Sequence, residues 1–397
     1  MLHMDNSNST IGSCEQNHLS PNSLGNKKLF TPGPLGVSLT TRQALLKDLG
    51  SRDTEFINTV SFIRQKLLDI AGVSSHSFTC VPMQGSGTFA VEAVLTTTVP
   101  RTNGKVLVLE NGAYGKRIGQ ILKVLGVENT VLSFDEDKSI DVGVVKDHLR
   151  KDSLYTNVSI VHCETSAGVF NPVSKIGALV KKYIPDAYYF VDAMSSFGAV
   201  PLDLEDSNVH FLVSSANKCL EGVPGFSYAI AHKESLLQCK GRARSMSLDL
   251  VGQYEGLSKN GQFRFTPPTH TMLAFKQALI EHEEEGGVVG RANRYKKNNA
   301  ILKDGMKKFG FKELVNDNDQ GYIITSYHYP KNSNFNFQDF YARLNDKDQV
   351  IYPGKVTTAD CFRIGNIGHL YPEDMTNLIS CIEEVCRDMN MSLPLVE

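Results

Sequence analysis

The chain has 397 residues, of which 41% are hydrophobic and 21% charged, and its 41 basic and 43 acidic residues leave a net charge of −2. This composition is ordinary for a globular enzyme, and the small net charge argues against the basic field of a nucleic-acid-binding protein. No run of about 18 uninterrupted apolar residues occurs, so we expect neither a membrane span nor a membrane partner.

Residues 1–28 are rich in Asn and Ser and lack both the apolar core of a secretory signal and the Arg-rich pattern of a transit peptide. They are predicted to form a disordered extension. The eight cysteines are scattered without metal-ligand spacing, and a disulfide framework is not expected in a chain of this size. We therefore predict reduced, mostly buried thiols, no metal site and a cytoplasmic location.

Strand and helix signals alternate once the Pro/Gly-rich arm at 29–38 has passed. The expected helices are 41–49, 55–71, one ending near 99, 115–125, 142–149, 176–182 and 273–285. The expected strands are 77–83, 105–110, 129–133, 158–163, 188–192 and 211–214, with 228–232 as an antiparallel addition. This alternation predicts an α/β fold with a mostly parallel sheet.

The pattern changes after the sequence EEGGVVG at 284–290. Downstream we expect a helix at 291–309, strands near 322–328, 350–352 and 361–364, and a closing helix with Pro372 in its first turn. The chain is therefore divided into a large domain at 29–285 and a smaller α+β domain at 286–397.

One lysine and one aspartate carry most of the functional information. Asp192 ends the buried strand pattern YYFVD, and Lys218 follows the next strand in SSANKCLEGVPGF. Either residue alone reads as an ordinary polar side chain. Together, just past the ends of two parallel strands, they favour pyridoxal phosphate chemistry, in which a lysine forms a Schiff base and an acid holds the pyridinium nitrogen protonated.

Other polar residues also fall just past predicted strand ends, where ligands bind in open α/β sheets. Gly85–Thr88 opens a helix and can cradle a phosphate, although it also reads as a Gly-rich turn with an N-cap. Tyr114 can stack on a flat ring or be a half-buried surface tyrosine, and Thr165 can hydrogen-bond a ring substituent. Arg363 alternates with apolar residues, so it meets either a substrate anion or a structural carboxylate.

Two other classes compete with this interpretation. Ser215-Ala216-Asn217-Lys218 matches the S-x-x-K element of penicillin-binding acyl transferases, but the chain lacks the K-T-G element of that class. The second alternative is a non-catalytic binding protein that has kept the fold. The presence of both Lys218 and Asp192 argues against it.

From residue 29 onward the chain resembles the class V aminotransferases of PLP fold type I. The resemblance rests on the segments TPGP, GSGTFAVEA, NGAYGKR, HCETSAGV, VDAMSSFG, SSANKCLEGVPGF, RFTPPTHT, VIYPGKV and FRIGNIG. Within that class the segments are most similar to the branch that transfers the amino group of 2-aminoethylphosphonate to pyruvate. Alanine–glyoxylate and serine–glyoxylate aminotransferases share the general plan and form the alternative.

The resemblance implies a role for each matching residue. Lys218 is expected to form the Schiff base with pyridoxal 5'-phosphate and Asp192 to hold the pyridinium nitrogen. The resemblance also places Arg363 on the substrate anion and Thr266 on the phosphate of the neighbouring subunit's cofactor, which implies a homodimer. The remaining expected cofactor contacts are Ser86, Gly87, Thr88, Tyr114, Thr165 and Asn217.

Overall fold

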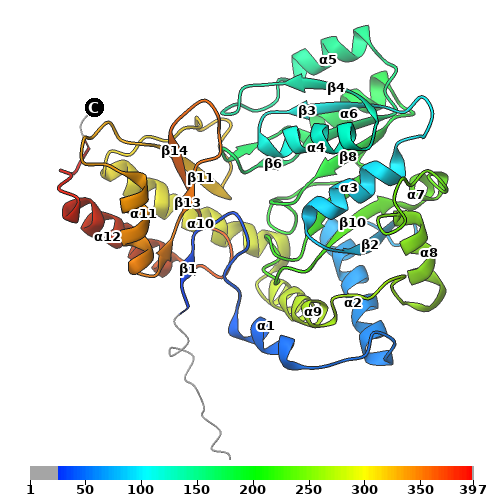
Figure 1. Cartoon of the computed structure of the whole chain (residues 1–397), viewed down its shortest axis with the longest axis horizontal. Helices are drawn as coiled ribbons and strands as arrows, with labels where there is room; N and C mark the ends of the chain where they lie inside the picture. Colours follow the sequence, from blue (N-terminus) through cyan, green and yellow to red (C-terminus); the bar gives the residue numbers. More distant parts are fainter. Residues whose placement is uncertain (1–25, 396–397) are drawn as a thin grey trace, which may run out of the picture.

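A computed structural model describes residues 26–395, and Figure 1 shows a large unit built around one sheet with a smaller unit beside it. The large sheet has seven strands in the order β2-β10-β9-β8-β5-β3-β4. Its strands are β2 (Phe78–Gln84), β3 (Lys105–Glu110), β4 (Glu128–Ser133), β5 (Asn157–Val161), β8 (Tyr188–Asp192), β9 (Phe211–Ser215) and β10 (Phe226–His232). Strand β10 runs antiparallel to both of its neighbours, and the other pairs are parallel. The predicted α/β fold with a mostly parallel sheet is confirmed.

Burial explains why these strands form. All residues of β5 and β9 are buried, as expected for central strands that helices cover on both faces, whereas the edge strand β4 has no buried residue. The helices of the large unit are α1 (Leu39–Gln43), the 3-10 turn η2 (Ala44–Leu46), α2 (Thr54–Ala71), α3 (Gly87–Thr98), α4 (Ala113–Val124), α5 (Val142–Lys151), α6 (Val173–Tyr183), α7 (Lys233–Gln238), α8 (Leu250–Asn260) and α9 (Thr269–Glu284). A short hairpin, β6 (Cys163–Glu164) and β7 (Val169–Phe170), follows β5.

The sheet topology gathers polar residues at one edge. Because β2 and β9 are both antiparallel to β10, they run in the same direction as β8, β5 and β3. The carboxyl ends of these strands therefore meet at a single edge. Asp192 is the last residue of β8, Lys218 follows β9, and Ser86 follows β2.

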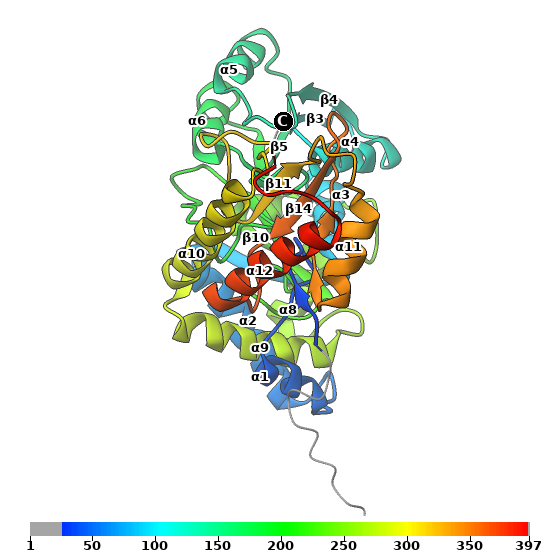
Figure 2. The same ribbon diagram turned by 90° about the vertical axis from the view of Figure 1, so that its left-hand side faces the viewer.

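The smaller unit packs around its own core. Its helices are α10 (Gly287–Lys308), α11 (Phe337–Asp346) and α12 (Pro372–Asp388), and its strands are β11 (Ile324–His328), β12 (Gln349–Val350), β13 (Tyr352–Pro353) and β14 (Cys361–Gly365). Helices α10 and α12 contact each other, and Figure 2 shows them crossing one face of the molecule together. Helix α12 begins with Pro372 in its first turn and buries Met375, Leu378, Ile382 and Val385.

The N-terminal arm belongs structurally to this smaller core. Strand β1 (Lys28–Leu29) pairs in parallel with β12, and Phe30 is buried among apolar residues from 302 to 391. The predicted disordered extension lies outside the described residues except for residues 26–28, of which Lys28 already forms β1. The division into domains at 29–285 and 286–397 stays a prediction.

No helix within residues 26–395 is both long and apolar enough to cross a bilayer. All seven cysteines in this range are unpaired, and six of them are buried, as predicted for mostly buried thiols. Cys14 lies outside the described residues, and the cytoplasmic location stays a prediction.

Candidate active site

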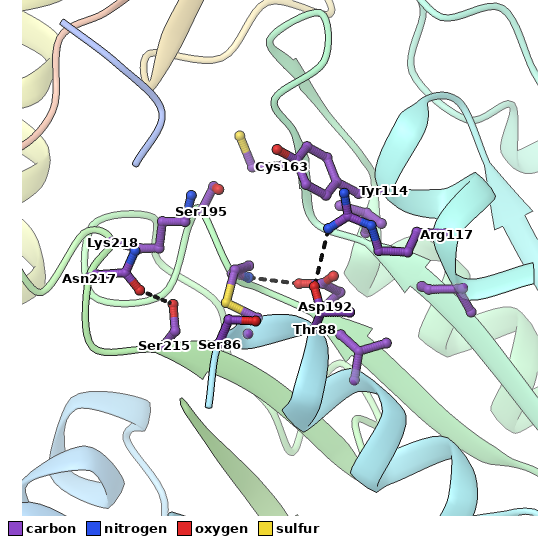
Figure 3. Close-up of a pocket in the computed structure, with 15 residues that line it drawn as sticks. Ser86, Thr88, Tyr114, Arg117, Cys163, Asp192, Ser195, Ser215, Asn217 and Lys218 are labelled. Carbon is purple, nitrogen blue, oxygen red and sulfur yellow. Dashed lines mark hydrogen bonds between the residues drawn. The ribbon is translucent and has the colours of Figure 1, made fainter. Parts of the chain in front are cut away.

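A cavity of about 270 Å³ lies at the carboxyl edge of the large sheet. Figure 3 shows Lys218 and Asn217 on one side of it and Tyr114 and Arg117 on the other, with Asp192 between them. The predicted site residues that line the cavity are Ser86, Gly87, Thr88, Tyr114, Asp192, Asn217 and Lys218. These predicted residues come from four chain segments, which meet as the strand ends predict.

Lys218 is held by the N-terminal arm. Its Nζ donates a hydrogen bond to the carbonyl of Pro32 at 2.6 Å. A Cβ at Gly33 would come within 2.5 Å of the same Nζ, and Gly33 has φ +127, so this close approach requires glycine. Burial lowers the pKa of Lys218 to about 8, an effect that Cys219 and Asp192 partly oppose. A substantial fraction of Lys218 is therefore neutral and nucleophilic near that pH.

Asp192 is buried at the end of β8, and its carboxylate accepts the backbone N–H of Met194 at 2.9 Å. Burial raises the pKa of Asp192 to about 6, against the effects of the Met194 N–H, Lys218 and Arg117. Most of the carboxylate is therefore ionised at neutral pH. A buried anion at this position would stabilise a protonated ring nitrogen.

The start of helix α3 offers the cavity a binding site for an anion. Ser86 precedes α3, whose first residues Gly87 and Thr88 line the cavity, so the unpaired N–H groups and positive end of that helix lie beside it. A Cβ at Gly87 would come within 2.3 Å of the Met194 side chain, so a larger residue there would displace the methionine end. The Thr88 hydroxyl accepts a hydrogen bond from Arg117 at 3.2 Å.

Three of the predicted residues do not line this cavity. Arg363 is buried on β14, where its Nε donates to the carbonyl of Pro353 at 2.9 Å and its Nη1 to the carbonyl of Thr165 at 2.7 Å. The Thr165 hydroxyl is buried without a hydrogen-bond partner among the described residues. Thr266 is exposed, and its backbone carbonyl accepts a hydrogen bond from Gln84.

The acyl-transferase alternative does not match this geometry. The Ser215 hydroxyl donates to the Asn217 Oδ1 at 3.0 Å, whereas the Lys218 Nζ bonds to Pro32. Figure 3 shows this serine directed at Asn217 and not at the lysine amine. Among the described residues, no lysine forms a hydrogen bond with the Ser215 hydroxyl that would activate it as a nucleophile.

Arg117 is a cavity-lining cation that was not among the predicted site residues. Arg117 lies one helical turn after Tyr114, with its Cζ 5.0 Å from the centroid of the tyrosine ring. The i, i+3 spacing in NGAYGKR would have placed these two side chains on one face of the helix. The cavity is also lined by residues outside the predicted set, namely Val91, Ile118, Val161, Cys163, Met194 and Ser195.

The fold and the residues of the site place the chain in one class of enzymes. The profile of the family "Aminotransferase class-V" matches residues 41–351, and the chain belongs to that family. The solved pyridoxamine–pyruvate aminotransferase of Mesorhizobium loti superposes with a TM-score of 0.84 at 23% identity, covering 93% of this chain and 94% of that one. The overall fold is therefore PLP fold type I, and the enzyme depends on pyridoxal phosphate as its class does.

Particular relatives match along almost the whole chain. A 2-aminoethylphosphonate–pyruvate transaminase of Bacteroides fragilis is 45% identical over 358 residues, which cover 90% of this chain and 98% of the relative. A bifunctional phosphonoacetaldehyde hydrolase/aminoethylphosphonate transaminase of Clostridioides difficile is 47% identical over 357 residues. The alignment covers 90% of this chain but only 56% of that relative, so the chain spans little more than half of its length.

The residues present fit the cofactor. The cavity offers a nucleophilic lysine and a buried carboxylate, and a helix N-terminus lies beside Ser86 and Thr88. The unpaired Thr165 hydroxyl is a further buried donor. We propose that Lys218 holds the cofactor covalently, Asp192 its ring nitrogen, Ser86, Gly87, Thr88 and Asn217 its phosphate end, and Tyr114 its ring face.

The pKa of Lys218 makes cofactor capture dependent on pH. Only the neutral amine attacks a carbonyl, so the rate at which cofactor-free protein captures pyridoxal phosphate should rise with pH and level off above about 8. An unperturbed lysine would level off only above about 10.4. Stopped-flow absorbance of the added cofactor measures this rate. A pH-independent rate, or a midpoint near that of free lysine, would contradict the assignment.

Proposed function

We propose that this enzyme transfers the amino group of 2-aminoethylphosphonate to pyruvate and produces phosphonoacetaldehyde and alanine. The observation that carries the proposal is Arg363, a buried cation whose hydrogen bonds within the described part of the chain go to backbone carbonyls and not to a carboxylate. Such a charge is costly unless an anion meets it, and both proposed substrates bring one. The likeness to 2-aminoethylphosphonate–pyruvate transaminases over almost the full chain supports these particular substrates.

The roles proposed for Lys218 and Asp192 follow from their protonation states near neutral pH. Pyridoxal phosphate, when bound, supplies an electron sink and a carbon that takes up and returns the amino group. Lys218, with a pKa near 8, would accept the proton of the amine-bearing carbon of the donor at its Nζ. Asp192, ionised at neutral pH, would keep a proton on the ring nitrogen beside it. The Pro32 carbonyl orients the lysine amine from the side of the arm.

Arg363 would serve both substrates in turn. Its Nε and Nη1 are fixed by the carbonyls of Pro353 and Thr165, so the guanidinium has one orientation, and its Nη2 makes no hydrogen bond to the described residues. This remaining edge is free for a phosphonate or a carboxylate oxygen. Arginine stays charged even where burial lowers its pKa.

Comparison of amino donors tests the proposal. With pyruvate as acceptor, 2-aminoethylphosphonate should give phosphonoacetaldehyde and alanine at a far higher kcat/KM than serine gives its keto product. The comparison is repeated with glyoxylate as acceptor. Preferential use of alanine or serine with glyoxylate would replace the substrates proposed here by those of the glyoxylate aminotransferases, with Lys218 and Asp192 in the same roles.

We also propose that two copies of the chain form a homodimer with shared active sites. Thr266 is exposed, and the neighbouring Phe265 and Phe89, which follows the cavity-lining Thr88, expose 42% and 50% of their surface. Large aromatic side chains at this exposure beside a cavity are typical of an interface. Sedimentation analysis should give twice the chain mass, and a fully active monomer would contradict the proposal.

A further inference from the structure

A loop of the smaller unit brings a second lysine to the site. The loop joins β13 to β14, and its Lys355 is half-buried with Nζ 4.4 Å from the centroid of the Tyr114 ring. Arg117 lies 5.0 Å from the same centroid. Two cations from different units of the fold therefore meet on one cavity-lining tyrosine.

This loop is tied in place. The buried Glu136, in the segment after β4, accepts hydrogen bonds from the Thr357 backbone N–H at 2.6 Å and from the Thr357 hydroxyl at 3.1 Å. Glu136 also accepts a hydrogen bond from the Lys116 Nζ at 2.9 Å. The tether lies two residues from Lys355 and fixes it relative to the large unit.

Arg363 completes a cluster of three cations, which we define as Arg117, Lys355 and Arg363. Within residues 26–395 none of the three forms a salt bridge with a carboxylate. The acidic residue near them, Glu164, is buried, which raises its pKa, and it accepts hydrogen bonds from the N–H groups of Tyr114 and Gly115 and from the Ser166 hydroxyl. Burial lowers the pKa of Lys355, and repulsion from Arg117 and Arg363 lowers it further. The cluster thus carries positive charge that no described carboxylate meets in a direct salt bridge.

We propose that Lys355 is a specificity-determining residue that, with Arg363, binds the phosphonate of the amino donor. This inference rests on the proposed function. A carboxylate has one negative charge and two oxygens, and the arginine alone can hold it. A phosphonate has up to two charges and three oxygens, so it gains from a second cation, and lysine supplies the compact point charge suited to that position.

Binding of unreactive anions tests the inference without turnover. The holoenzyme is titrated calorimetrically with ethylphosphonate and with propionate, which lack the amine. Lys355→Met should weaken ethylphosphonate binding roughly 10- to 100-fold, the loss expected for one charge-assisted hydrogen bond. Propionate binding should change less than about threefold. Lys355→Arg keeps the charge and should retain most of the affinity, while Lys123→Met removes an exposed lysine from the same helix as Arg117 and should change neither ligand.

Single-turnover kinetics separate this inference from the proposed function. In Lys355→Met, reaction of the bound cofactor with 2-aminoethylphosphonate should slow by a similar factor, whereas reaction with alanine stays near the wild-type rate. Wild-type enzyme that ignores 2-aminoethylphosphonate would overturn both proposals. If wild-type enzyme uses 2-aminoethylphosphonate and Lys355→Met is unimpaired, or is impaired equally with alanine, only the role of Lys355 is overturned.

Discussion

Replacement of Lys218 by alanine should abolish turnover while leaving the cofactor bound. The loss should be about 10⁴-fold or more, because one residue supplies both the covalent attachment and the proton transfer. Pyridoxal phosphate should still bind non-covalently through Asp192 and the start of α3. Turnover is measured as alanine formed from 2-aminoethylphosphonate and pyruvate. Cofactor binding is measured as the pyridoxal phosphate that stays with the protein through gel filtration.

The variant Lys218→Arg separates the nucleophilic and proton-transfer roles of the lysine from its positive charge. Arginine keeps the positive charge beside Asp192 but does not lose its proton near neutral pH, so this variant should be as inactive as the alanine variant. Lys240→Ala, which removes an exposed lysine paired with Glu255, is the control and should behave like wild type. Activity of either Lys218 variant within tenfold of wild type would exclude its proposed role.

The largest effect on stability is expected from Arg291. This buried side chain joins the loop after Lys218 to the smaller unit, since its Nε bonds to Glu285 at 2.6 Å and its Nη1 lies 3.3 Å from Glu221 and also donates to the carbonyl of Cys219. Arg291→Met fills a similar volume, but it removes one of the two arginines that form ion pairs with Glu221 and Glu285 and leaves Arg294 as the other. The free energy of unfolding should fall by about 3–5 kcal/mol.

Urea unfolding of the holoenzyme measures this loss. The matched control is Arg343→Met, which breaks an exposed i, i+4 pair with Asp339 at 2.9 Å and should cost less than about 0.5 kcal/mol. If both variants lost the same free energy, the buried network around Arg291 would not hold the two units together.

The sequence was sufficient for the sheet and for the lysine–aspartate pair because both depend on local patterns. Each strand of the large sheet was visible as a short apolar run, and Asp192 and Lys218 stand at the ends of such runs. The parallel topology then brings their positions together without further information. The two residues were therefore predictable from spacing alone.

Other elements depend on contacts between distant segments. Helix α8 has a polar, Gly-containing sequence, and it is stabilised by the Asp249 cap on Gly252 and by burial of Leu250 and Leu257 against the large core. Strand β1 exists only because β12 pairs with it. Helix α11 differs, since its N-cap Asn336 and the spacing of its buried residues are local features from which the sequence does predict a helix.

The cluster of three cations in the site also depends on contacts between distant segments, which the sequence does not reveal. Arg363 was singled out because an arginine on an apolar strand is unusual, but Lys355 lies in a polar loop where a lysine is ordinary. Its proximity to Tyr114 arises from the Glu136–Thr357 tether between two units of the fold. No local pattern encodes such a contact.

Reduction of the holoenzyme with borohydride tests the central claim most directly. Borohydride fixes a lysine–pyridoxal phosphate bond, so the account predicts loss of the yellow colour and one cofactor-labelled peptide, which contains Lys218. The Lys218→Ala variant should give no labelled peptide. A colourless protein, or a label on a different lysine of wild-type enzyme, would contradict the account.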